Sequence, residues 1–247
     1  MKKRRLKIFG ERNTGTNYLD KLVRSNLNVD LLRGVVPRPV HKYFLGTELP
    51  KDVYFALTFP RNLGWKHALV PSPDRIRNMG VYSNDLVFLT LTKNPYSWLL
   101  SLYRRPYHVR GKTASFETFL TARWKPVRRE RLNGTWPNPI ELWNLKNGSY
   151  LRLRSSVACE NLRYEDLLSD PETTISHIAS GQRIGWVGEG FHNVVESTKE
   201  KGKDFSYYVD YYLNEDWRAK LTAESIAIIN GSLDWRVVEA FGYSRIA

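Results

Sequence analysis

The chain alternates short, predominantly apolar runs with stretches in which apolar residues recur at helical spacing. Such runs occur near residues 6–9, at 53–59 (VYFALTF) and at 85–92 (DLVFLTLT). Apolar runs without polar alternation are typical of strands buried on both faces of a parallel sheet. We therefore predict core strands at these positions, the second bounded by Pro60, and a further strand at 157–163.

Apolar residues three and four positions apart predict helices between these strands and after the last of them. The predicted helices cover 18–27, 96–105, 115–124, 222–230 and 233–241, and Pro171 opens another short one. Residues 28–50 contain several prolines and are expected to be irregular. Strands that alternate with helices imply an α/β fold whose central sheet is mostly parallel and flanked by helices.

Composition adds a strong charge to this picture. The 247 residues are 42% hydrophobic, enough for a sizeable core, and we expect residues 1–247 to form a single domain. A formal net charge of +13 predicts anionic partners without choosing among nucleotide, sulfated glycan, nucleic acid and membrane surface. One cysteine, Cys159, excludes an internal disulfide, and we propose no metal because no ligand cluster has suitable spacing.

The N-terminus does not read as a targeting segment. Residues 1–5 (MKKRR) resemble the basic start of a signal peptide, but no apolar segment of the required length follows. No run of about 18 apolar residues occurs, so we expect no transmembrane segment and a cytoplasmic protein.

The most informative segment is the turn at residues 9–17, FGERNTGTN, between the first strand and the first helix. Its glycines and the helix N-terminus would direct successive backbone N–H groups toward one anion. The spacing Gly-x4-Gly-Thr is that of a P-loop, yet the lysine of a nucleotide-binding P-loop is absent and Asn17 stands where that loop would continue. The turn therefore predicts a phosphorylated donor other than ATP or GTP.

A second phosphate contact is predicted where residues 85–92 end. Lys93 follows this strand directly, and Ser101 lies eight residues later on the helix that Pro95 opens. The ammonium and the hydroxyl could bind the same phosphate. Taken alone, the pattern also fits a solvated lysine and a serine on a helix surface.

These segments together resemble the PAPS-dependent sulfotransferases, whose donor is 3′-phosphoadenosine 5′-phosphosulfate. Residues 14–18 (TGTNY) are similar to the Ser-Gly-Thr-Thr-Trp half of the family's 5′-phosphosulfate loop. Residues 93–95 (KNP), with Ser101, are similar to its 3′-phosphate motif, with Lys in place of Arg. Residues 164–171 (YEDLLSDP) resemble a family segment whose tyrosine, here Tyr164, lies near the adenine. The matches occur in the family's order.

The resemblance implies a three-layer P-loop-like fold and a binding site for PAPS. The donor-binding residues that it implies are Arg12, Asn13, Thr14, Gly15, Thr16, Asn17, Lys93, Ser101 and Tyr164. The chain departs from the family at Asn13, where relatives carry a lysine that touches the bridging oxygen and the sulfonate. Because negative charge develops on the departing phosphate, a cation is expected there, and Arg12 and Lys66 are the candidates.

A general base is also needed to accept the proton of the acceptor hydroxyl. Residues 64–71 (GWKHALVP) resemble a family segment that often contains a histidine, which makes His67 the first candidate. His41 is the reserve, and Glu11 stays in consideration because some branches use glutamate. His108 is better placed for contact with the acceptor than for catalysis.

The expected activity is transfer of the sulfonate of PAPS to a hydroxyl of a carbohydrate or glycolipid. Basic residues and tryptophans between 104 and 143 could bind an acidic or neutral glycan, although a solvated basic face is the alternative. Nucleic acid is not expected as a partner. The rival functions are a P-loop-type kinase or NTPase, which would need a loop lysine, and a non-enzymatic polyanion-binding protein, which the net charge alone suggests.

Overall fold

A parallel sheet forms the centre of the fold. The computed structural model describes residues 3–43, 46–78, 85–107, 114–123, 125–134, 136–196 and 202–247. Its four-stranded sheet has the order β2-β1-β3-β4 and consists of β1 (Arg4–Gly10), β2 (Val29–Leu31), β3 (Leu86–Thr92) and β4 (Cys159–Arg163). All neighbouring strands pair in parallel. Every residue of β3 is buried, as expected for the central apolar run.

The register brings the carboxyl ends of the strands together. Gly10 of β1 lies beside Leu91 of β3, and Thr92 of β3 lies beside Arg163 of β4. From β1 the chain proceeds first to β2 on one side and later to β3 on the other. Parallel sheets offer a binding crevice at such a switch point, outside the carboxyl ends of the strands. The loops that follow β1 and β3 meet there.

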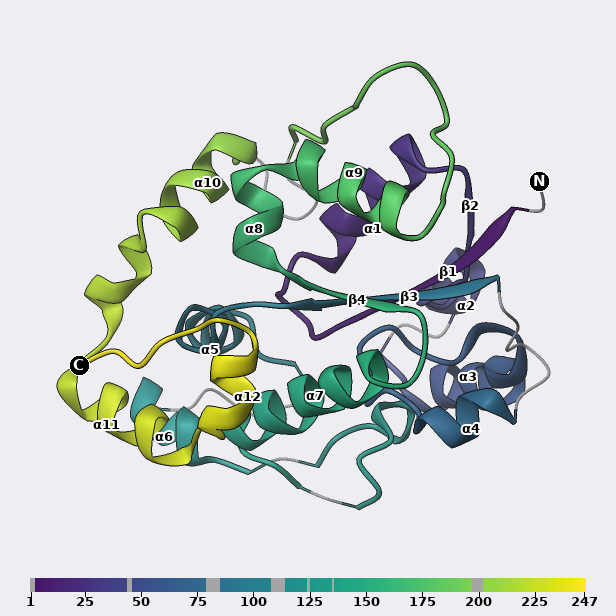
Figure 1. Ribbon diagram of the computed structural model, residues 1–247. Helices are drawn as coiled ribbons and strands as arrows, with labels where there is room; N and C mark the ends of the chain where they lie inside the picture. The colour runs from purple at the N-terminus through teal and green to yellow at the C-terminus, as the bar shows by residue number, and fades with distance from the viewer. Residues whose placement is uncertain are drawn as a thin grey trace.

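Helices cover both faces of the sheet (Figure 1). One face carries α1 (Thr16–Asn26), α8 (Tyr164–Ser169) and α9 (Pro171–Gly181). The helices on the opposite side include α3 (Leu49–Asn62), α4 (Pro73–Arg77), α6 (Phe116–Thr121), α7 (Pro139–Arg154), α11 (Ala223–Ser232) and α12 (Trp235–Ala240). The three-layer α/β architecture predicted from the sequence is confirmed.

Three further helices surround the carboxyl edge and the β2 region. They are α2 (Arg38–Tyr43), α5 (Pro95–Arg104) and α10 (Phe205–Leu213). Two 3-10 turns, η1 (Arg128–Glu130) and η2 (Asp216–Lys220), complete the described elements. In Figure 1, α10 lies beyond the ends of the strands, above α5. Within the described ranges, no helix combines the length and the apolar character needed to cross a bilayer.

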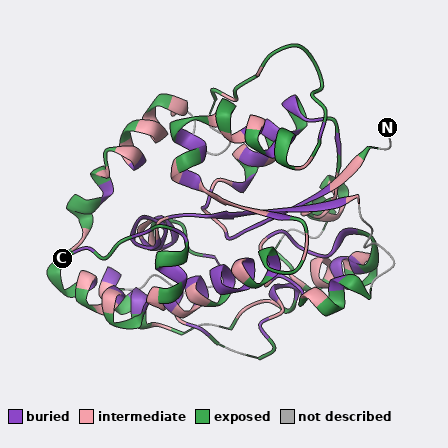
Figure 2. Ribbon diagram, in the orientation of Figure 1, coloured by how far each residue is buried: buried purple, intermediate pink, exposed green. Residues whose placement is uncertain are grey.

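The strand predicted at residues 53–59 is wrong, because these residues lie within α3. Phe55 and Phe59, four positions apart, are buried, whereas Val53 is 47% and Leu57 is 77% exposed. The helix has both a buried and an exposed side (Figure 2), and apolar residues of the run lie on each, so its sequence carries neither strand nor helix periodicity. Pro60 does not bound the element either but lies in its last turn.

Other elements were absent from the sequence prediction. Residues 28–50, expected to be irregular, contain β2 and α2. Helix α7 buries Lys146, Asn147 and Ser149, so it lacks the polar and apolar faces that reveal a helix. Helix α10 is rich in tyrosine and was not predicted at all. Helices α4 and α8 were not predicted either. Helices α1, α5, α11 and α12 begin and end within about two residues of the predicted positions, α9 begins at Pro171 as predicted, and α6 ends at Thr121, before the predicted end.

Candidate functional site

The β1–α1 loop, residues 10–17, presents an open helix N-terminus. Gly15 is the N-cap of α1 with φ +86°, and no side chain caps the helix. The first turn contains no acidic residue. The N–H groups of a first helical turn have no partner within the helix, and the helix dipole makes this end positive. The loop is therefore built to receive an anion.

Position 15 requires a glycine for two reasons, its positive φ and the closeness of the Tyr164 ring. A Cβ atom added there would lie 2.4 Å from Cε2 of Tyr164, far inside van der Waals contact. The ring of Tyr164 thus covers the loop at its tightest point. The structure brings together Gly15 and Tyr164, which the resemblance assigned to opposite parts of the donor.

Two other loop residues shape the turn itself. The hydroxyl of Thr14 is buried and donates to the carbonyl of Glu11 at 2.6 Å, so it does not face a ligand. Asn13 has φ 64°, in the left-handed region that asparagine tolerates. Its amide donates to the carbonyl of Ser101 at 3.5 Å, which ties the loop to α5. Asn13, at the family's lysine position, therefore helps to fix the loop.

Lys93 and Ser101 meet as predicted. The Lys93 ammonium donates to Oγ of Ser101 at 3.0 Å and lies 3.6 Å from the ring centroid of Tyr212. Lys93 is 1% exposed. Burial lowers the pKa of Lys93 well below its usual value; nearby Glu165 opposes the shift, and Arg104 reinforces it. A bound phosphate would favour the charged form and offset this cost.

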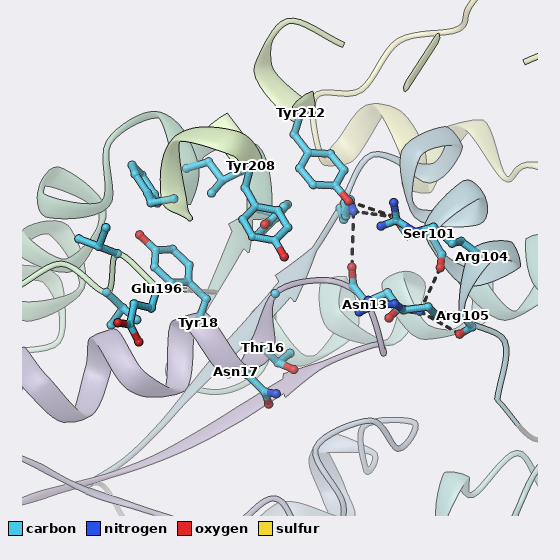
Figure 3. A pocket seen from close by; sticks show the side chains of 17 residues that line it. Asn13, Thr16, Asn17, Tyr18, Ser101, Arg104, Arg105, Glu196, Tyr208 and Tyr212 are labelled. Carbon is cyan, nitrogen blue, oxygen red and sulfur yellow. Dashed lines mark hydrogen bonds between the residues drawn. The ribbon is translucent and has the colours of Figure 1, made fainter. Parts of the chain in front are cut away.

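A pocket, called the first pocket below, connects the start of α1 with the Lys93–Ser101 pair. Thr16 and Asn17 lie at one end of it, and Ser101 and Tyr212 at the other (Figure 3). Helix α10 supplies an aromatic wall that sequence reasoning missed, formed by Phe205, Tyr208 and Tyr212. These positions recur three and four residues apart, so the helical period within FSYYVDYYL could have revealed it.

A second pocket lies against the same loop. It is lined by His67 together with Arg12, His41, Lys66, Trp65, Phe55 and Tyr107, among others. Asn13, Thr16, Asn17 and Arg105 line both pockets. A group bound at the N-terminus of α1 in the first pocket would therefore lie next to the second. His108 lies outside the described residues.

His67 is held in one tautomer. Its Nδ1 lies 2.6 Å from the carbonyl oxygen of Gly10. A carbonyl can only accept, so Nδ1 carries the proton and Nε2 has the free lone pair. Burial, Lys66 and Arg12 lower the pKa of His67 well below 6.5, and its bond to Gly10 opposes the shift only in part. His67 is thus a neutral histidine with Nε2 able to accept a proton.

Gly10 connects the loop to the histidine segment. Its backbone N–H donates to the carbonyl of Lys66 at 3.0 Å, and its carbonyl accepts the bond from His67. The Lys66 ammonium in turn donates to Oδ1 of Asn17 at 2.7 Å. Lys66 therefore contacts Asn17, one of the residues that line both pockets.

The side chain of Arg12, unlike that of Lys66, lies against aromatic rings of the second pocket. Its guanidinium carbon lies 4.9 Å from the ring centroid of Trp65 and 4.2 Å from that of Tyr107. It lines the second pocket but not the first. Of the two candidates for the missing loop cation, Lys66 is the one in contact with the helix start.

Glu11 does not serve as a free base. Its carboxylate forms a buried ion pair with Lys146 at 3.0 Å and accepts from the hydroxyl of Tyr107 and the N–H of Arg12, both at 2.6 Å. His41, the reserve base, is exposed on α2 at the second pocket. Among the described residues, no three His, Cys, Asp or Glu side chains are grouped so that they could hold a metal ion.

Comparison with known proteins finds similarity in structure only. No known family matches the sequence, and no curated protein does. The sulfotransferase domain from the curacin biosynthetic pathway is similar over 100% of this chain and 99% of its own, with TM-score 0.50 and 12% identity.

Two other solved structures align less well. The sulfotransferase from Alicyclobacillus acidocaldarius covers 93% of this chain and 97% of its own at TM-score 0.43 and 15% identity. The sulfotransferase domain from the Synechococcus PCC 7002 olefin synthase covers 93% and 94% at TM-score 0.44 and 14% identity. At such identities the likeness concerns the fold and not the activity. The chain has the sulfotransferase fold.

Proposed function

We propose that this protein transfers the sulfonate group of PAPS to a hydroxyl of an acceptor. One observation carries the proposal: two anion contacts, the open start of α1 and the Lys93–Ser101 pair, share the first pocket, while a neutral histidine adjoins the same loop from the second. A nucleotide with phosphates at both its 5′ and 3′ positions fits such a two-ended site.

In this proposal the first pocket binds the donor. The backbone N–H groups at Gly15, Thr16 and Asn17 would hold the 5′-phosphosulfate, because they start a helix without a capping side chain. Lys93 and Ser101 would hold the 3′-phosphate, and that dianion would favour the charged form of the buried Lys93 side chain. The ring of Tyr164, which lies over the loop, would contact the nucleotide between them.

The second pocket would hold the acceptor. Nε2 of His67 would accept the proton of the acceptor hydroxyl while the hydroxyl oxygen forms a bond to sulfur. The bond between sulfur and the phosphate oxygen of PAPS breaks in the same step. The charge that develops on the departing phosphate falls near Asn17, where Lys66 already donates a hydrogen bond. We assign to Lys66 the role that a loop lysine has in the sulfotransferases that the sequence resembles.

The first test compares three nucleotides in thermal unfolding. 3′,5′-ADP at about 100 times its dissociation constant should stabilise the fold by about 2.7 kcal/mol, and 5′-ADP or ATP at equal concentration by less. An equal effect of 5′-ADP would show that the 3′-phosphate is not recognised and would contradict the proposal. Preference for ATP would favour the kinase alternative. A screen of hydroxyl acceptors with labelled PAPS then tests turnover directly.

A further inference from the structure

Two cation–π contacts hold Arg12 at the second pocket, and a third joins Arg129 to one of the same rings. The guanidinium of Arg129 lies 4.6 Å from the Trp65 ring, and that of Arg12 lies 4.9 Å from the same ring and 4.2 Å from the ring of Tyr107. Arg129 is anchored by ion pairs to Glu48 and, at 2.8 Å, to Asp52. In the resulting stack, Arg129–Trp65–Arg12–Tyr107, the guanidinium of Arg12 lies over the Trp65 ring and over the Tyr107 ring.

The edge of the same guanidinium lacks a partner. No carboxylate of the described residues forms an ion pair with Arg12, and its buried Nε donates to no atom. Arg129, in the same stack, has two carboxylates. A buried guanidinium N–H without an acceptor costs free energy. The N–H groups of a guanidinium point outward in its plane, so a planar oxyanion binds them side by side at that edge.

The surroundings of Arg12 also favour an anion. Arg38, Lys66 and Arg105 line the second pocket with it, and no Asp or Glu is among the described residues that line that pocket. The charge of Arg12 is close enough to His67 to help lower the pKa of that histidine. Apolar surface lies beside these charges, from Val36, Phe55 and Trp65.

We propose that the acceptor carries an oxyanion in addition to the hydroxyl that receives the sulfonate. Arg12 binds that oxyanion, a carboxylate, phosphate or sulfate ester, while the apolar wall contacts the carbon skeleton of the acceptor. This inference rests on the proposed function, since it assigns the second pocket to the acceptor. The donor's own sulfonate is the other possible partner, but Arg12 does not line the first pocket, and Lys66 is the cation at Asn17.

The test uses acceptor probes that differ only in charge. A series of aryl and alkyl hydroxy acids, with 4-(hydroxymethyl)benzoate as the first, is compared with the matching methyl esters by calorimetry. With 3′,5′-ADP bound, the wild type should bind the acids roughly 10-fold or more tighter than the esters. Arg12→Gln should remove this preference and leave the affinity for 3′,5′-ADP nearly unchanged.

Two further variants distinguish two-point hydrogen bonding by Arg12 from a general effect on folding. Arg12→Lys keeps the charge without the bidentate edge, so it should retain only part of the preference. Arg61→Gln removes an exposed arginine of α3 that lines neither pocket, and should leave the preference intact. Melting temperatures of all variants check that the fold persists.

The outcomes distinguish the two proposals. The absence of an acid preference across the series, with or without nucleotide, would overturn the anionic-acceptor proposal. So would an Arg12→Gln variant that loses affinity for 3′,5′-ADP but keeps the acid preference, because Arg12 would then act on the donor. Failure of the wild type to bind 3′,5′-ADP would refute the proposed function, and the acid preference would still be measurable without nucleotide.

Discussion

On one side of the β1–α1 loop a lysine ammonium faces a tyrosine ring, and on the other an arginine guanidinium contacts two aromatic rings. Lys93 in the first pocket donates to a serine hydroxyl, whereas Arg12 in the second leaves the edge of its fork without a carboxylate. Both charges are held by aromatic faces instead of by acids. A ligand anion can therefore bind at either place without first displacing a carboxylate.

The shapes of the two cations suggest different ligands. An ammonium is a compact charge with three donors and suits a phosphate that approaches from a single direction. A guanidinium fork selects for planar, two-point contact. We therefore expect substitutions in the first pocket to weaken nucleotide binding. Substitutions in the second pocket should instead lower turnover or the affinity for the acceptor.

The largest effect is expected from Gly15→Ala. A Cβ at this position would lie 2.4 Å from the Tyr164 ring at a residue with φ +86°. We expect binding of 3′,5′-ADP to be lost and the melting temperature to fall. Gly190→Ala is the matched control, because Gly190 has φ +83° but nothing within 4 Å of an added Cβ.

The Gly190→Ala control separates the clash with Tyr164 from the backbone strain of an alanine at positive φ. Gly190→Ala should cost only the roughly 1–2 kcal/mol of a left-handed alanine and leave nucleotide binding unchanged. Equal destabilisation by both substitutions, with binding retained in each, would mean that the contact between Gly15 and Tyr164 does not shape the first pocket.

His67→Ala should affect the second pocket alone. Loss of a general base is expected to lower turnover roughly 10²- to 10⁴-fold while 3′,5′-ADP binds as before. Because the pKa of His67 is lowered well below 6.5, the wild-type rate should stay level through neutral pH and fall only on the acid side of that value. The variant should lack this acid limb.

His41→Ala provides the comparison for the base. It removes an exposed histidine that lines the same pocket, and it should leave the acid limb in place. Full activity of His67→Ala together with a loss in His41→Ala would transfer the role of base to His41.

Lys93→Met should act on the first pocket alone. It keeps most of the side-chain volume but removes one charge-assisted contact, worth roughly 1.5–3 kcal/mol. Calorimetry should show this loss for 3′,5′-ADP and a much smaller one for 5′-ADP. A similar loss for both nucleotides would mean that Lys93 does not contact the 3′-phosphate.

The smallest effect concerns the anchor of the arginine stack. Burial raises the pKa of Glu48, which is paired with Arg129, but hydrogen bonds from Arg129 and Lys51 outweigh burial and lower this pKa from 4.5 to about 2. A lowered folded-state pKa contributes stability that is complete above pH 4.5 and is lost as the pH falls toward 2. Because Glu48 is partly exposed, the contribution should not exceed about 1 kcal/mol.

Urea unfolding across this pH range checks the prediction. Glu48→Gln should be less stable than the wild type at pH 7, and the two should converge as the medium becomes acidic. The exposed Glu189→Gln serves as control for the change in charge. A difference between wild type and Glu48→Gln that persists at low pH would have a cause other than ionisation.

The first pocket was largely predictable from the sequence because its motifs are local. A strand, a glycine turn and a helix place Gly15 and Thr16 without knowledge of the rest of the fold. The eight-residue spacing of Lys93 and Ser101 likewise follows from one helix. Tyr164 and the aromatic wall come from α8 and α10, and only the tyrosine had a motif to reveal it.

The second pocket was much less predictable. Arg12, Trp65 and Tyr107 come from three separate segments, and no pattern along the chain shows that their side chains stack. Helix α3, which borders them, was assigned to the wrong class of element because its apolar residues lie on all sides. His67 was identified by resemblance, but its tautomer depends on a carbonyl 57 positions away.

The bonds of Gly10 also bear on how such a site can change in evolution. Both its N–H and its carbonyl are used by residues 66 and 67, so the loop and the base form one unit. An insertion in either segment would separate His67 from the helix start. Under the proposed function, residues of α2 and α3 at the second pocket can then change with the acceptor, while the two hydrogen bonds of Gly10 keep His67 beside the helix start.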